Sequence, residues 1–142
     1  MKTTEHTNGI LDSLLRGELS AIETYGHAIH NFTGSPLHSV LCGIRREHIS
    51  SAQILRDLIK QHGGEPSTSS GSWGSLAGTV ETVAAWFGED SAVAALRQGE
   101  KHGVREYHEA LLAHNVGHVV KDAIRDGLVP PLHRHVEVLA YH

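Results

Sequence analysis

One pattern of residues occurs twice in this chain and constrains its fold more than any other feature. A glycine–glutamate pair is followed by six residues, a tyrosine, two more residues, an alanine and then isoleucine or leucine, at residues 17–29 and again at residues 99–111. Apolar side chains in both copies recur every three or four residues, the period of an amphipathic helix. In each copy the glutamate falls on the apolar face, where an unpaired carboxylate is costly. The repeat therefore predicts two core helices whose glutamates share a chemical role.

The same periodicity predicts four long helices, over about residues 4–31, 36–62, 90–114 and 118–142. Pro130 and Pro131 lack backbone donors, so a kink or break is expected at residues 127–131 of the fourth helix. Residues 65–89 form a long connection, a loop rich in serine and glycine followed by a short helix at residues 75–87. Long crossovers of this kind occur in ferritin-like bundles.

These elements predict a single all-α domain over residues 1–142, built from two helical hairpins joined by the crossover. The net charge of −4 argues against nucleic acid or an anionic membrane surface as a partner. We expect no signal peptide, and no apolar run approaches the roughly 18 residues of a membrane span. The single cysteine, Cys42, excludes an internal disulfide and fits a reducing compartment. The composition thus predicts a cytoplasmic globular protein.

Each of the four long helices carries one polar residue near the middle of its apolar stripe. In chain order these residues are Glu18, His48, Glu100 and His135. Two residues of an antiparallel hairpin lie level when the turn is midway between them. The midpoint of Glu18 and His48 falls in the first interhelical turn, at residue 33, and that of Glu100 and His135 falls in the last turn, between residues 117 and 118. The spacing therefore predicts that all four side chains meet at one depth of the bundle.

Two carboxylates and two imidazoles in one core suit a divalent cation, because the two negative charges offset the ion and both ligand types bind iron, manganese or zinc. Di-iron bundles of the standard kind carry a Glu-x-x-His pair on two helices. Here Arg45 stands three residues before His48, and Leu132 three before His135. Glu47 is a further candidate ligand. One metal ion, or two completed by Glu47 and water, are both compatible with the pattern.

Two tyrosines follow the glutamates of the repeat. Tyr25 and Tyr107 each lie seven residues after a glutamate, about 10.5 Å along a helix. They are candidates for a hydrogen-bonding or redox role beside a metal, although core aromatics with a hydroxyl group near the site are the commoner case. His102 and Glu106 lie at helical spacing and form a pair able to bind a metal ion, for which a solvated helix surface is the simpler interpretation.

Three stretches carry a resemblance to a known family. They are residues 99–111, the sequence Gly-Gly-Glu-Pro at residues 63–66 with the Ser/Gly/Trp loop after it, and His135 with Leu139. Over nearly its whole length the chain resembles small bacterial ferritin-like proteins of a family without assigned function. The resemblance implies a ferritin-like four-helix bundle with a short crossover helix, a homodimer, a bacterial cytoplasm and a link to stress responses. Related ferritin-like families hold two irons or manganese, which by analogy implies the candidate ligands Glu18, His48, Glu100 and His135.

Two functions from different classes follow. The leading hypothesis is a ferritin-like protein that binds iron or manganese in the bundle core through Glu18, His48, Glu100, His135 and Glu47, with oxidation of iron or removal of peroxide as the reaction if it is an enzyme. The alternative is a metal-free structural or interaction bundle, dimeric, in which the buried Glu/His quartet sets packing specificity.

Overall fold

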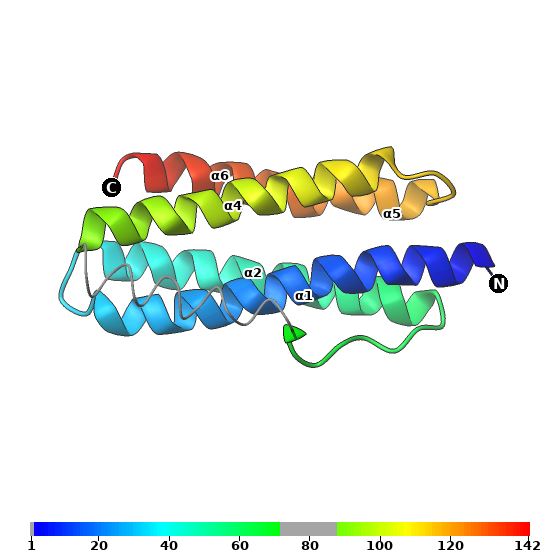
Figure 1. Cartoon of the computed structure of the whole chain (residues 1–142), viewed down its shortest axis with the longest axis horizontal. Coiled ribbons are helices and arrows are strands. Elements are labelled where there is room, and N and C mark those ends of the chain that lie inside the picture. The colour runs from blue at the N-terminus through cyan, green and yellow to red at the C-terminus, as the bar shows by residue number, and fades with distance from the viewer. Residues whose placement is uncertain (1, 72–87) are drawn as a thin grey trace.

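A computed structural model describes residues 2–71 and 88–142 of the chain (Figure 1). Its helices are α1 (Lys2–Asn31), α2 (Leu37–Gln61), α4 (Glu89–Leu112), α5 (His118–Ala123) and α6 (Val129–Ala140), with a π-helix, η2 (Ile124–Leu128), between the last two. The predicted all-α, four-helix architecture is confirmed, because α5, η2 and α6 follow one another without a gap and form the fourth rod; the two described ranges contain no strand. The short helix predicted at residues 75–87 lies outside the described residues.

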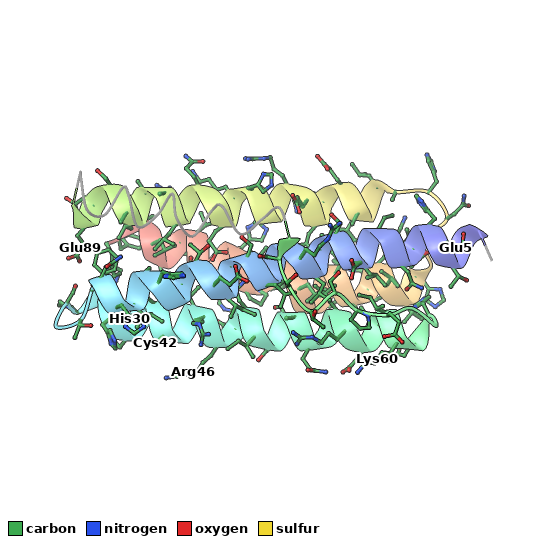
Figure 2. The ribbon with its side chains drawn as sticks, turned by 60° about the horizontal axis from the view of Figure 1, so that its bottom comes forward. Glu5, His30, Cys42, Arg46, Lys60 and Glu89 are labelled. Atoms are coloured by element: carbon green, nitrogen blue, oxygen red, sulfur yellow. The ribbon has the colours of Figure 1, made fainter. Side chains whose placement is uncertain are left out.

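The four rods form two antiparallel hairpins. Figure 1 shows α1 beside α2 in one layer and α4 beside α5 and α6 in the other. The N-terminus lies at the same end of the bundle as the α4–α5 turn, and the C-terminus lies at the end of the α1–α2 turn. As a result α1 and α4, the helices that carry the repeated motif, run in opposite directions. Figure 2 shows the exposed side chains of Arg46 and Lys60 on α2 pointing outward.

A polar layer divides the apolar core into two clusters. In α2, Ile44 belongs to the cluster near the α1–α2 turn and Ala52 belongs to the cluster near the α4–α5 turn, with His48 between them. The first cluster contains Phe32, Leu37, Leu41, Leu96 and Leu139 among others, and the second contains Leu11, Leu15, Leu55, Ile59, Ile124 and Leu128. Burying these side chains contributes roughly 1.5–3 kcal/mol each. The two clusters therefore hold the helices in register on both sides of the polar layer.

The fourth rod contains a π-helix directly before its proline pair and continues without a break. Within η2 the helix widens, and the Val129 N–H donates to the Ile124 carbonyl five residues earlier. Pro130 and Pro131 then occupy the first turn of α6, where a missing N–H is tolerated. The expected interruption is thus a local widening, and the helix continues to bring α6 alongside α4. π-helical turns of this kind occur frequently near functional sites.

Hydrogen bonds tie the segment after α2 to α1. The backbone N–H and the hydroxyl group of Ser67 donate to the Asp12 carboxylate at 2.9 and 2.6 Å. Ser70, which is buried, donates to Glu23 at 3.0 Å. These bonds fix the start of the crossover on the outer side of α1. None of the helices in the described part of the chain combines the length and apolar character of a membrane span.

Candidate metal centre

All four polar residues of the apolar stripes meet inside the bundle. Glu18 of α1, His48 of α2, Glu100 of α4 and His135 of α6 are each between 2% and 4% exposed. The spacing within each hairpin predicted that Glu18 lies beside His48 and Glu100 beside His135, and these pairs are 2.6 and 3.3 Å apart. A further contact of 2.7 Å between His48 and Glu100 links the two hairpins. The heptad-like periodicity of each helix turns these positions inward together with the leucines around them. The result is one continuous polar cluster enclosed by apolar side chains.

His48 is the hub of this cluster. Its Nδ1 lies 2.6 Å from Glu18 Oε2 and its Nε2 lies 2.7 Å from Glu100 Oε1. Burial opposes the charged imidazolium, but the negative charges of Glu18 and Glu100 outweigh it and raise the pKa of His48 to about 10. Without a metal ion His48 is therefore protonated at neutral pH and donates one hydrogen bond to each glutamate.

Glu100 is the carboxylate that contacts both histidines. Besides its bond to His48, its Oε2 lies 3.3 Å from His135 Nδ1. Burial alone raises the pKa of a carboxyl group, but the positive charge of His48 and the hydrogen bonds from His135 and His48 lower the pKa of Glu100 to about 2. Glu100 is consequently ionised in the folded protein over the whole physiological pH range.

Glu47 links His135 to the protein surface. Its Oε1 lies 3.1 Å from His135 Nε2, and Arg134 donates to its Oε2 at 2.7 Å. The Glu47 side chain is 41% exposed. Burial, the largest single influence, raises the pKa of Glu47, but the hydrogen bonds from Arg134 and His135 and the charges of these two residues together outweigh it and lower the pKa. Glu47 thus contacts the cluster through His135 on α6, and Arg134 of the same helix holds the Glu47 carboxylate in this position. The helical spacing of the sequence gave no signal for this role of Arg134.

Each tyrosine of the repeat donates a hydrogen bond to the glutamate of the other copy. Tyr25 donates to Glu100 Oε1 at 2.7 Å, and Tyr107 donates to Glu18 Oε1 at 2.7 Å. Burial, and then the charge of the neighbouring glutamate, raise the pKa of both phenols well above the ordinary value. Tyr25 also stacks on the His48 ring, with centroids 5.4 Å apart. Both tyrosines are therefore neutral donors that orient the two carboxylates.

Three of the buried residues can hold a metal ion together. His48, Glu100 and His135 each offer one ligand atom, and these atoms all lie within 4.8 Å of one another. Two histidines and one carboxylate with open positions form a ligand set that suits Fe(II). Each histidine also has a carboxylate on its far side, Glu18 behind His48 and Glu47 behind His135. Such outer carboxylates orient imidazole ligands and raise their basicity. The donor set therefore fits a divalent transition metal.

A pocket of about 70 Å³ lies between α1 and α4, next to this cluster. Glu18, Tyr25, His48, Glu100 and Tyr107 form the polar part of this pocket next to the cluster, and His102 and Glu106 also line it. Its other walls are mainly small or apolar residues, namely Leu14, Gly17, Ala21, Thr24, Ala95, Leu96, Gly99, Gly103 and Leu132. A Cβ atom added at Gly17 would meet only Glu106 Oε2, at an ordinary contact distance of 3.8 Å, so Gly17 leaves space along the seam where α1 faces α4. The pocket gives the buried cluster an approach from one side of the bundle.

Comparison with known sequences places the chain in a family. Residues 6–113 match the model described as "Domain of unknown function (DUF2383)", which covers more than half of the chain. The chain belongs to the DUF2383 family. Neither a curated protein sequence nor a solved structure matches it. The DUF2383 match spans α1, α2 and α4 with Glu18, His48 and Glu100, whereas His135 lies beyond the matched range. The DUF2383 region therefore contains three residues of the cluster, and the fourth comes from α6.

Proposed function

We propose that this protein is a metal-binding helical bundle of ferritin-like type that holds a divalent transition-metal ion between His48, Glu100 and His135. One observation carries the proposal: three buried side chains from three different helices offer ligand atoms within 4.8 Å of one another. Ligand atoms of a bound ion lie about 2.0–2.2 Å from it. Small side-chain shifts are enough for these three groups to reach that distance.

The groups around the three ligands support the same function. When His48 Nε2 binds an ion, its Nδ1–H still donates to Glu18, which fixes the tautomer that a ligand needs. Glu47 does the same for His135 from the opposite side. In this arrangement Glu18 and Glu47 act on the ion through the histidines, and Tyr25 holds Glu100 in place.

Iron and manganese are the proposed ions, with zinc as the third choice, because imidazole plus carboxylate accepts all three. A redox-active ion with open positions supplies one-electron chemistry, so we propose oxidation of iron or removal of peroxide, in a bacterial stress response, as the activity. The small pocket supports a small substrate of this kind, because its volume of about 70 Å³ accommodates a few water-sized molecules beside the cluster.

A metal-free bundle is the second candidate, and a different observation favours it. Both nitrogens of His48 and both oxygens of Glu100 have hydrogen-bond partners without an ion. A fully satisfied buried network can specify helix register by itself. On this alternative the protein is a structural or interaction module, homodimeric as the family resemblance implies, and its quartet has no ligand.

Metal analysis of protein purified without chelator separates the two candidates. The first predicts about one equivalent of iron or manganese, and an added free energy of unfolding of about 2.7 kcal/mol when the ion is present at 100 times its dissociation constant. Glu100→Gln should abolish both effects, because it removes the central carboxylate while keeping its size. Glu137→Gln, an exposed position on α6, is the matched control and should bind as the wild type does. Metal content below about a tenth of an equivalent, with unchanged stability on adding either ion, would establish the metal-free alternative.

A further inference from the structure

The pocket between α1 and α4 has an exposed end and a buried end. At the buried end Glu18 and Glu100 are at most 4% exposed. At the other end the Glu106 side chain is 22% exposed and that of His102 is 47% exposed, and both line the same pocket. The lining residues thus lead from solvent to the polar cluster, with His102 and Glu106 at the mouth.

The two mouth residues form a pair with the geometry of a cation site. His102 Nε2 lies 2.7 Å from Glu106 Oε1, one helical turn apart on α4. Two ligands that bind one ion at about 2.1 Å lie about 3.0–3.4 Å apart, so the pair needs only a slight opening to accept a metal. Glu106 Oε2 points across the seam, since it lies 3.8 Å from where a Cβ atom of Gly17 on α1 would stand. The pair is therefore anchored on one helix and reaches towards the other.

The chemistry of the pocket explains why such a pair is useful. Between mouth and floor the walls are mostly apolar or very small residues, including Leu14, Ala21 and Leu96. A divalent ion that enters an apolar passage loses hydration that the walls do not replace. A carboxylate and an imidazole at the mouth offset part of this loss and raise the local concentration of cations.

We propose that His102 and Glu106 form an outer cation-binding site, at which a divalent metal ion docks before it passes through the pocket to His48 and Glu100, the two ligands of the proposed centre that line the pocket. This inference rests on the proposed metal-binding function, because it assigns a loading route to that centre. The outer site takes the same class of ion, with only two protein ligands and therefore lower affinity. It acts on how fast the centre fills and empties and leaves its affinity at equilibrium unchanged.

Stopped-flow absorbance with Co²⁺ as the probe tests the proposal on the full chain. Glu106→Gln should slow loading of the centre by about tenfold, the lower end of the range for electrostatic steering. His102→Ala should slow it as well, because it removes the second ligand of the outer site. Release into excess chelator should slow by the same factor, so the dissociation constant for Co²⁺ stays that of the wild type. Glu109→Gln is the matched control, because it removes one carboxylate from the same helix at an exposed position that does not line the pocket.

Wild-type rates in both variants would overturn the proposal and leave His102 and Glu106 as an adventitious surface pair. Equal slowing in Glu109→Gln would also overturn it, since the effect would then be one of general charge. Failure of the centre itself gives a different result: the wild type would show no Co²⁺ signal that depends on Glu100. In a Glu100→Gln background the outer site should retain weak Co²⁺ binding that His102→Ala removes, and absence of that binding counts against the outer site alone.

Discussion

The hydroxyl group of Tyr25 on α1 donates to Glu100 on α4 across 2.7 Å, although the two residues are 75 positions apart in the chain. Reciprocally, the hydroxyl group of Tyr107 on α4 donates a hydrogen bond to Glu18 on α1, also at 2.7 Å. Each tyrosine stands about 10.5 Å along its helix from the glutamate of its own motif. Because α1 and α4 are antiparallel, this offset places each tyrosine level with the glutamate of the other copy. The repeat is thus a pair of reciprocal contacts that joins the two hairpins at their centre.

Loss of either tyrosine hydroxyl group should destabilise the bundle. Tyr25→Phe or Tyr107→Phe removes a hydrogen bond to an ionised, buried carboxylate, for which we expect a loss of about 1.5–3 kcal/mol in the free energy of unfolding. Urea unfolding at neutral pH measures this loss. Tyr141→Phe is the control, because Tyr141 is 81% exposed and its hydroxyl group needs no protein partner. Equal stability of all three variants and the wild type would show that the crosswise bonds contribute nothing.

Stability of the metal-free protein should depend on pH at both ends of the range. His48 has a pKa of about 10 in the folded protein and an ordinary value of 6.5, so its contribution is complete below pH 6.5 and is lost as pH rises through 10. Glu100 has a pKa of about 2 against an ordinary 4.5, so its contribution is complete above pH 4.5 and is lost as pH falls towards 2. We expect maximal stability between about pH 4.5 and 6.5.

Urea midpoints measured from pH 2 to pH 11 in the presence of chelator check this profile. His48→Gln should flatten the alkaline side, since the group that titrates there is gone. Glu100→Gln should flatten the acid side for the same reason. A wild-type midpoint that does not move between pH 6.5 and 10 would contradict the raised pKa of His48.

Metal binding should release a proton at neutral pH. An imidazole must be neutral to bind a metal ion, but His48 is protonated below its pKa of about 10 in the metal-free protein. Affinity should therefore rise with pH, by up to about tenfold per unit for one released proton. Calorimetric titration with Mn²⁺ in two buffers of different ionisation heat counts the protons. Binding that releases none at pH 7 would mean that His48 is not a ligand.

The sequence specified the depth of the cluster but not its connections. Periodicity placed Glu18 and His48 level in their hairpin, because spacing along a helix depends only on residue number, and they lie 2.6 Å apart. Which nitrogen of His48 faces which glutamate depends on side-chain rotamers that only the packed neighbours determine. Glu47 adjoins His48 in the chain, yet it contacts His135 and Arg134 of α6. That contact depends on the angle between rods, which no local pattern encodes.

The proline pair shows that local sequence also leaves the backbone conformation of the fourth rod undetermined. Pro130 and Pro131 correctly marked a disturbance in the fourth rod, since neither residue can donate a helical hydrogen bond. Local sequence does not distinguish a break from a widening. Packing decides between them, because Ile124 and Leu128 of η2 are fully buried and a break would expose them. The π-helix keeps both side chains in the core and lets α6 carry His135 to the cluster.

The two buried glutamates should differ in their effect on metal binding, although the repeat makes them equivalent in sequence. Glu100 belongs to the three-residue group with His48 and His135, so Glu100→Gln should abolish tight binding of Mn²⁺ at this centre. Glu18 supports His48 from behind at 2.6 Å, and Glu18→Gln should weaken binding by about 10–100-fold. Both variants preserve side-chain size, so each serves as the packing control for the other. Dissociation constants from calorimetry or manganese paramagnetic resonance measure the difference, and equal losses in the two variants would show that both glutamates bind the ion directly.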